Sequence, residues 1–211
     1  HVPPAGGWAE ALWQIGPMAR RVEDLILAMK LLAAEDEDDF TSPPVPLLES
    51  EKSKDLRLAF FTDNGFARCS PEIQAAVKQC AAFFSQNGAR VEERRPPGVE
   101  QAYELELALL GADGVEGIGD GPAHPYLTHF VDHMRPYRAS GAEFAKRWAQ
   151  WDEYRKNLRR FFREYDAILC PVYTQVALKH GESLIEENFR GFSYTMASSV
   201  AGAPAASVRC A

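Results

Sequence analysis

Apolar residues recur at helical spacing near the start of the chain. Between residues 19 and 32 they occupy every third or fourth position, at Val22, Leu25, Ile26, Met29 and Leu32. This spacing predicts a helix, and Glu23 and Asp24 stand in its first turns, where the helix dipole favours negative charge. Proline and glycine interrupt the preceding residues 1–17, and an acidic, proline-containing stretch follows the helix at 35–46. Both stretches are expected to be irregular.

An apolar run, a helical stripe and a second short run follow one another between residues 56 and 93. Residues 56–61 are nearly all apolar, which predicts a strand buried on both faces. A helix is predicted next, with Ser70 as its cap, Pro71 in its first position and Asn87-Gly88 as its stop. Its apolar stripe consists of Ile73, Val77, Cys80, Phe83 and Phe84. With a second strand at 89–93, the segment is predicted to be a βαβ unit with two parallel strands.

Helical patterns dominate residues 98–165. One helix is predicted from about 99 to 110, and the five glycines of 111–121 predict a loop. A long helix is predicted over 142–165, where one face carries Trp148, Trp151, Tyr154, Leu158, Phe161 and Tyr165. Residues 167–170 then form a short strand. The order of elements predicts an α/β fold, a mixed, largely parallel sheet flanked by helices, with 98–165 as a mostly helical insertion.

Composition narrows the class of protein. The chain has 211 residues, of which 46% are hydrophobic, so it can bury a core of one large domain or two small ones. Its formal net charge of -7 disfavours nonspecific binding to nucleic acid. The four scattered cysteines indicate neither a zinc site nor a disulfide framework and favour a cytoplasmic location. No apolar run approaches the roughly 20 residues of a membrane span. We therefore expect no nucleic-acid or membrane partner and no cofactor.

Three patterns resemble sites of chemistry, and each has a plainer interpretation. His129 and His133 are four residues apart, as in some helical metal sites, but no third ligand can be identified. Residues 117–121 are rich in glycine but lack the G-x-G-x-x-G spacing of a phosphate-binding loop. Ser198 and Ser199 would need a base to act as nucleophiles, and none can be assigned. We favour a polar helix, a flexible loop and small packing residues.

The predicted helix over 142–165 permits two interpretations. Arg155, Arg159, Arg160 and Arg163 lie largely off its aromatic stripe. An aromatic and basic surface can bind nucleic acid, a membrane or another partner. An amphipathic helix whose aromatic face packs into the core has the same pattern, and this is the commoner case. The first interpretation makes the chain a noncatalytic binding or assembly module that uses this helix.

Three segments, taken in order, resemble the amidase signature family. Residues 13–25, WQIGPMARRVEDL, are similar to the family's G-P-M/L-A-R-x-V-x-D segment, which leads into a helix. Residues 165–171, YDAILCP, are similar to its Y-D-A-L/I-L-x-P strand. Residues 192–205, FSYTMASSVAGAPA, are similar to its F/Y-T-x-x-x-N-L-x-G-x-P-A segment, with Ser199 and Val200 in place of the common Asn and Leu. The resemblance spans nearly all of the chain and is closest to the bacterial general amidases.

This resemblance implies a fold and an activity. Residues 1–211 are expected to be the C-terminal portion of a single amidase signature domain, with 98–165 inserted on the substrate side. Family members hydrolyse the C–N bond of linear carboxylic amides by acyl transfer to a serine, using a Ser-Ser-Lys triad. In the family this triad precedes the Gly-Pro-Met-Ala-Arg segment, so it is expected upstream of His1, and the chain alone is expected to contain no catalytic residue and to be inactive. It would associate with the missing N-terminal portion or form a homodimer. An amidotransferase A-type subunit is a further alternative.

Candidate substrate-pocket residues follow from the same resemblance. The two loops that resemble active-site loops contain Tyr173 in one and Tyr194, Thr195 and Met196 in the other, and Trp13 is a weaker candidate. The expected ligand is a small-molecule amide. Aromatic and methionine side chains are also ordinary core residues, so a structural role is the alternative for these positions.

Overall fold

The computed structural model describes residues 16–33, 55–113, 115, 124–183 and 185–209. The chain divides into two compact units, residues 1–51 and 52–211. In the first unit, the helix predicted from the apolar spacing is present as α2 (Val22–Leu32). A single domain over the whole chain remains a prediction.

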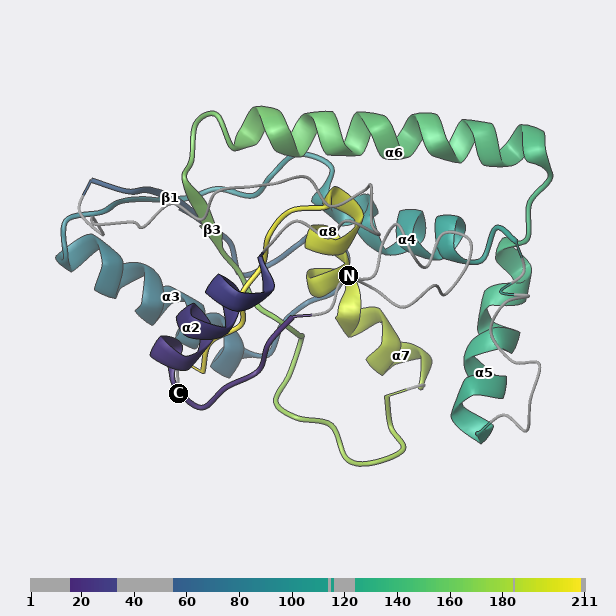
Figure 1. Ribbon diagram of the computed structural model, residues 1–211, viewed down its shortest axis with the longest axis horizontal. Helices are drawn as coiled ribbons and strands as arrows, with labels where there is room; N and C mark the ends of the chain where they lie inside the picture. Colours follow the sequence, from purple (N-terminus) through teal and green to yellow (C-terminus); the bar gives the residue numbers. More distant parts are fainter. Residues whose placement is uncertain (1–15, 34–54, 114, 116–123, 184, 210–211) are drawn as a thin grey trace. The chain divides into compact units, whose positions relative to one another are not determined.

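The second unit contains a parallel sheet (Figure 1). Its strands are β1 (Arg57–Phe60), β2 (Arg90–Glu93) and β3 (Ala167–Leu169), in the order β2-β1-β3. β1 pairs in parallel with both neighbours. The predicted βαβ unit is confirmed, and so is the α/β class with a parallel sheet and flanking helices.

α3 (Pro71–Gln86) joins β1 to β2 and begins and ends as predicted. Pro71 occupies its first position, and Gly88 after its C-cap takes a left-handed φ of 94°, which glycine adopts without strain. The predicted cap is wrong in its chemistry: the Ser70 hydroxyl makes no cap bond, and although it is buried it has no hydrogen-bond partner among the described residues. The Ser70 amide N–H instead donates to the Thr174 carbonyl oxygen at 2.7 Å. The start of α3 is therefore held by a backbone contact with the loop after β3 and not by a side-chain cap.

The predicted stripe of α3 is only partly buried. Of its five residues, Val77 is buried, Ile73, Cys80 and Phe84 are partly buried, and Phe83 is 61% exposed. A helix of 16 residues is about 24 Å long, but a strand of four residues covers only about 13 Å. The far end of α3 therefore extends beyond the short strands.

The opposite face of the sheet is covered by the end of α6 (Gly141–Phe161). Ala59 of β1 is fully buried against Phe161 and Tyr165, and Ile168 of β3 packs on the same cluster. In Figure 1, α3 and α6 lie on opposite sides of the strands. The sheet is therefore the middle of three layers.

The remaining elements form a helical layer beside the sheet. They are η1 (Val99–Gln101), α4 (Ala102–Leu110), α5 (Pro125–Met134), η2 (Arg135–Tyr137), α7 (Glu186–Phe189), η3 (Arg190–Phe192) and α8 (Ser193–Ala201). The predicted helices at 99–110 and 142–165 are confirmed, although the second ends at Phe161. α4 is buried on nearly every face and packs against both α6 and α8.

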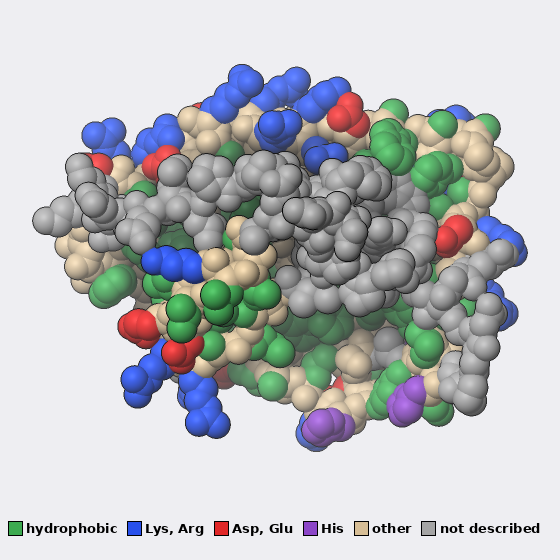
Figure 2. Space-filling view, in the orientation of Figure 1, with side chains coloured by type: hydrophobic (Ala, Val, Ile, Leu, Met, Phe, Trp, Pro, Cys, Tyr) green, Lys and Arg blue, Asp and Glu red, His purple; other side chains and the backbone are tan. Residues whose placement is uncertain are grey.

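The aromatic stripe of α6 is core. Trp151, Tyr154, Leu158 and Phe161 are buried, whereas Trp148 is half exposed. Trp151 Nε1 donates to the Val200 carbonyl oxygen at 2.6 Å, and this bond ties α6 to α8. Figure 2 shows lysine and arginine side chains gathered along the outer side of α6. Among the described helices, none has the length and apolar character needed to cross a membrane.

Candidate functional site

The loops that follow β1 and β3 meet at one edge of the sheet. Parallel strands place their carboxyl ends at the same edge, which is where ligands bind in open α/β sheets. Here the Ser70 amide N–H donates to the Thr174 oxygen at 2.7 Å, and Cys69 Sγ lies 3.5 Å from the Tyr173 carbonyl oxygen. These bonds hold the loop 61–70 against the loop 170–177.

Asn64 fixes the start of α8 to the same loops. Its side chain is fully buried, and Nδ2 donates to Ser193 Oγ at 2.8 Å. Its Oδ1 accepts from the amides of Phe66 and Ala67 at 3.0 and 2.9 Å, which closes a turn. One buried amide therefore shapes the loop after β1 and anchors α8.

Tyr194, a predicted pocket residue, is part of this anchor. Its ring is buried, and its hydroxyl donates to the Ala67 carbonyl oxygen at 2.7 Å and accepts from the Asn64 amide at 3.2 Å. Burial raises the pKa of the Tyr194 hydroxyl above its ordinary value. A protonated and fully bonded hydroxyl positions α8 and is not available to a substrate in this arrangement.

Tyr173 lies between the loop after β3 and η3. Its ring centroid is 5.0 Å from that of Phe192, and its hydroxyl donates to the Asn188 carbonyl oxygen. Gly191 passes so close that a Cβ there would lie 2.4 Å from Tyr173 Cε2. The absence of a side chain at residue 191 lets the ring sit against η3.

The predicted pocket residues therefore lie on segments in contact but face different ways. Met196 is buried, whereas Thr195 is exposed and its hydroxyl donates to the Phe192 carbonyl oxygen at 2.9 Å. Trp13 lies outside the described residues. Of the predicted set, Thr195 and the half-buried Tyr173 are the side chains open to contact from outside the unit.

A comparison with protein families decides where this arrangement belongs. The model of the family described as Amidase matches residues 3–211. The chain belongs to the amidase family. The resemblance found in its three segments is thereby confirmed.

Relatives within the amidase family carry several names. The A subunit of glutamyl-tRNA(Gln) amidotransferase from Lachnoclostridium phytofermentans is 26% identical over 96% of this chain and 48% of its own length. Vitamin D3 hydroxylase-associated protein of Gallus gallus is 31% identical over 58% of this chain and 26% of its own. The chain spans about half the length of the first of these relatives.

Solved structures of amidases share the fold. Fatty acid amide hydrolase superposes with a TM-score of 0.72 at 26% identity, covering 94% of this chain and 36% of that protein. The A subunit of glutamyl-tRNA(Gln) amidotransferase from Thermotoga maritima superposes with a TM-score of 0.71 at 22% identity, covering 93% and 45%. The structural similarity extends over nearly all of this chain.

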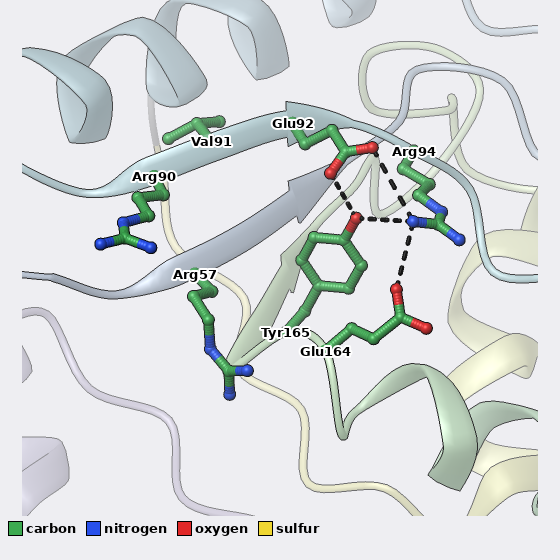
Figure 3. Close-up of a pocket in the computed structure, with 7 residues that line it drawn as sticks. All are labelled: Arg57, Arg90, Val91, Glu92, Arg94, Glu164 and Tyr165. Atoms are coloured by element: carbon green, nitrogen blue, oxygen red, sulfur yellow. Dashed lines mark hydrogen bonds and ion pairs between the residues drawn. The ribbon is translucent and has the colours of Figure 1, made fainter.

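A second polar region lies along β1 and β2 (Figure 3). It is an open depression of about 390 Å³ whose lining includes Arg57, Arg94 and Tyr165. The Tyr165 hydroxyl donates to Glu92 Oε2 at 2.5 Å and accepts from Arg94 at 3.2 Å. Arg57 pairs with Asp166 at 2.6 Å, outside the residues drawn. These charges neutralise one another, which is typical of a structural network.

Glu106 of α4 is a buried carboxyl group that the sequence did not single out. It is 8% exposed, and its Oε2 has no hydrogen-bond partner among the described residues. Burial raises its pKa from 4.5 to about 7, and a hydrogen bond from Ser199 opposes the rise only partly. An amphipathic pattern cannot identify such a residue, because α4 is buried on almost all sides.

The histidines and serines considered as candidates for metal binding or nucleophilic catalysis lie within helices. His129 and His133 lie on α5, and the described part of the chain contains no group of three potential metal ligands. Ser198 Oγ donates to the Thr195 carbonyl oxygen at 2.9 Å within α8. Asn64 and Gly191 were missed by sequence reasoning. The Asp63-Asn64-Gly65 turn signal after β1 was the available clue for Asn64.

Proposed function

We propose that this chain forms the substrate side of an enzyme that hydrolyses a carboxylic amide by acyl transfer to a serine. The observation that carries the proposal is the meeting of the loops after β1 and β3 with the start of α8, at the carboxyl edge of the sheet. This is the place where α/β folds bind small ligands. Membership of the amidase family supports amide chemistry at that edge.

Within this proposal, the candidate residues have two kinds of role. Thr195 and Tyr173 contact the small-molecule amide, because their side chains are exposed and half-buried. Tyr194 and Met196 form the wall behind them and set their positions. Trp13 is kept as a pocket candidate from the resemblance alone.

The chemical step needs a nucleophile, a base and oxyanion donors, and we assign none of these roles to the candidate pocket residues. A serine nucleophile requires a base within hydrogen-bond reach, and an oxyanion requires preorganised donors. By resemblance these are a Ser-Ser-Lys triad and a glycine- and serine-rich loop in the segment before the Gly-Pro-Met-Ala-Arg motif. We propose that another polypeptide portion supplies them by association with this chain.

An amidotransferase A-type subunit is the second candidate, favoured by the names of relatives that match 96% of the chain. Such a subunit would release ammonia from the amide of glutamine and would assemble with other subunits. The noncatalytic module has less support, because the aromatic face of α6 is buried in the core and only its basic face remains for a partner.

The test compares this chain alone with the chain mixed with the amino-terminal half of a family relative, after co-elution has shown that the two associate. Benzamide and glutamine are the substrates, and released ammonia is measured. If the mixture turns over a substrate and the chain alone does not, the proposal is supported. If the mixture turns over glutamine but not benzamide, the amidotransferase is favoured. Turnover by the chain alone contradicts the need for a second portion, and an inactive, associated mixture contradicts the hydrolase.

The pocket roles are tested in the active mixture with a matched pair of variants. Thr195→Ala and Ser198→Ala each remove a hydroxyl that donates to a carbonyl three residues earlier, at 2.9 Å in both cases. Their local effects on α8 should therefore be alike. We expect only Thr195→Ala to change the ratio of rates on benzamide and acetamide, and equal ratios in both variants would remove Thr195 from the pocket.

A further inference from the structure

The exposed side of α6 has a charge opposite to that of the chain as a whole. Residues 142–163 contain seven lysine and arginine residues against three aspartate and glutamate residues, whereas the chain has a net charge of -7. Figure 2 shows lysine and arginine side chains along the outer side of this helix. The positive charge is therefore concentrated on one element of an otherwise acidic protein.

The carboxylates of α6 are already paired with basic side chains of the same helix. The pairs have N–O distances of 3.6, 2.6 and 3.4 Å and are Glu143–Lys146, Asp152–Lys156 and Glu153–Arg160. Three further basic side chains, those of Arg155, Arg159 and Arg163, are exposed and form no ion pair with any described residue. The helix therefore presents three guanidinium groups that its own carboxylates do not neutralise.

Arg155, Arg159 and Arg163 form a row along α6. Residues four apart lie on the same side of a helix, about 6 Å apart along its axis. The turn after Phe161 continues this spacing, because the Arg163 amide N–H donates to the Arg160 carbonyl oxygen at 3.1 Å. The helix dipole favours a positive charge at Arg159 in the last turn, but its effect does not reach back to Arg155. The dipole alone therefore does not account for the row.

Aromatic side chains support the row and flank it. Cζ of Arg155 lies 4.6 Å from the centroid of the Trp151 ring, and this stacking limits the freedom that the guanidinium group loses on binding. Trp148, two turns before Arg155 on the same side, is 50% exposed, and Phe162 is 37% exposed. Tryptophan and arginine are enriched among the residues that contribute most to binding between proteins. The surface therefore combines charge with apolar contact area.

The groups around the row favour one class of partner. A lipid bilayer is disfavoured because most of the apolar face of α6 is buried in the core and cannot enter it. A nucleic acid is disfavoured because its continuous line of phosphates would approach Asp152 and Glu153, which are exposed on the same helix. Two copies that met symmetrically through this surface would set arginine against arginine. Carboxylates one turn apart on a partner helix match the spacing of the arginines and need not approach Asp152.

We propose that Arg155, Arg159 and Arg163 bind an acidic helix of a partner protein through three carboxylates spaced four residues apart. Apolar side chains of that helix pack against Trp148 and Phe162. Pairs of arginine and carboxylate are frequently bidentate, which fixes the register of the two helices as well as adding affinity. The inference goes beyond the proposed hydrolysis and does not depend on it, so either can fail without the other.

The first test measures the binding of a fluorescein-labelled helical peptide to the full chain by fluorescence anisotropy. The peptide carries glutamate at three positions four residues apart and leucine beside them, and a second peptide has the same composition in scrambled order. We expect the first to bind saturably and the second to bind about tenfold more weakly, the loss of three exposed ion pairs. Equal binding of the two peptides would show attraction by net charge alone and would overturn the proposal.

The second test removes the arginines one at a time and together. Glutamine removes the charge but is a good helix former, and circular dichroism confirms that each variant is folded. We expect Arg159→Gln to weaken binding of the patterned peptide about twofold and the triple variant with Arg155→Gln and Arg163→Gln to weaken it about tenfold. Arg135→Gln removes an exposed charge from η2 and is the matched control, which should leave binding unchanged. Equal losses in Arg135→Gln and Arg159→Gln would contradict a site on α6.

A reversal of charge tests the register. Arg159→Glu should repel the central glutamate of the peptide, and a peptide with lysine at that position should bind Arg159→Glu more tightly than it binds the unaltered protein. The absence of this preference would overturn the pairing. Oligouridylate is the competing ligand. If it binds the unaltered protein more tightly than the patterned peptide does, and the triple variant loses that binding, the surface is a nucleic-acid site and the proposal is wrong.

Discussion

The buried carboxyl group of Glu106 makes a sharp prediction about stability and pH. Its pKa is raised from 4.5 to about 7 because burial between α4, α6 and α8 disfavours the charged form. The folded protein therefore binds a proton that the unfolded chain releases above pH 4.5. Below pH 4.5 the group has no effect on stability. The free energy of unfolding falls as the pH rises from 4.5 to about 7, and above pH 7 the loss is complete.

The size of the effect follows from the same values. A rise from 4.5 to about 7 corresponds to about 3 kcal/mol of preference for the neutral form. Glu106→Gln keeps the shape and removes the charge. We expect the variant to match the unaltered protein at pH 4.5 and to be about 3 kcal/mol more stable at pH 8, a large fraction of a typical domain's stability.

Urea unfolding, followed by tryptophan fluorescence at both pH values, measures this difference. Glu104→Gln is the control, since it removes an exposed carboxylate from the same helix, where burial plays no part. The reasoning would be refuted if the free energies of unfolding of Glu106→Gln and the unaltered protein differed by the same amount at pH 4.5 and pH 8. That result would show that the carboxyl group is solvated.

Other substitutions test the carboxyl edge and the sheet. Gly191→Ala places a Cβ 2.4 Å from Tyr173 Cε2, so we expect the ring to move and the free energy of unfolding to fall by about 1–3 kcal/mol; an unmoved ring in a crystal structure would contradict this. Tyr194→Phe removes the hydroxyl between α8 and the loop after β1, and should cost about 1–2 kcal/mol in urea unfolding, whereas no loss would mean that these bonds are not formed. The Asp166 pKa is lowered from 3.8 to about 2 by its hydrogen bonds with Arg57, so the stability it gives above pH 3.8 is lost as the pH falls through 2. The unaltered protein should therefore lose slightly more stability than Asp166→Asn between pH 5 and pH 2 in circular-dichroism melts, an effect kept small by solvent, and equal losses would count against the pair.

The elements could be predicted from the sequence because their causes are local. Apolar spacing, Pro71 and Gly88 determine α3, and nearly continuous apolar runs determine β1. Tyr173 and Tyr194 were found through family resemblance, which places them on segments that the structure brings into contact. Periodicity alone would have marked both as core residues.

What could not be predicted depends on contacts between distant segments. Ser70 has the sequence of a helix cap, but its backbone bonds the loop after β3, more than 100 residues away. Glu106 lies in a helix buried on nearly all sides, where no polar face exists to reveal its position. Asn64 gains its role only when α8 arrives with Ser193, 129 residues later.

The geometry of α8 separates residues that shape a site from residues that can touch a ligand. Tyr194, Met196 and Val200 face inward, where their packing against α4 and α6 holds the helix in place. A change at these positions alters stability and activity together, so a loss of activity there says little about substrate contact. Thr195 lies on the exposed side, with one local bond that Ser198 duplicates a turn later. If Thr195→Ala changes the amide preference and Ser198→Ala does not, the loss of the local bond cannot be the cause. The change must then arise from contact with the substrate at the carboxyl edge of the sheet.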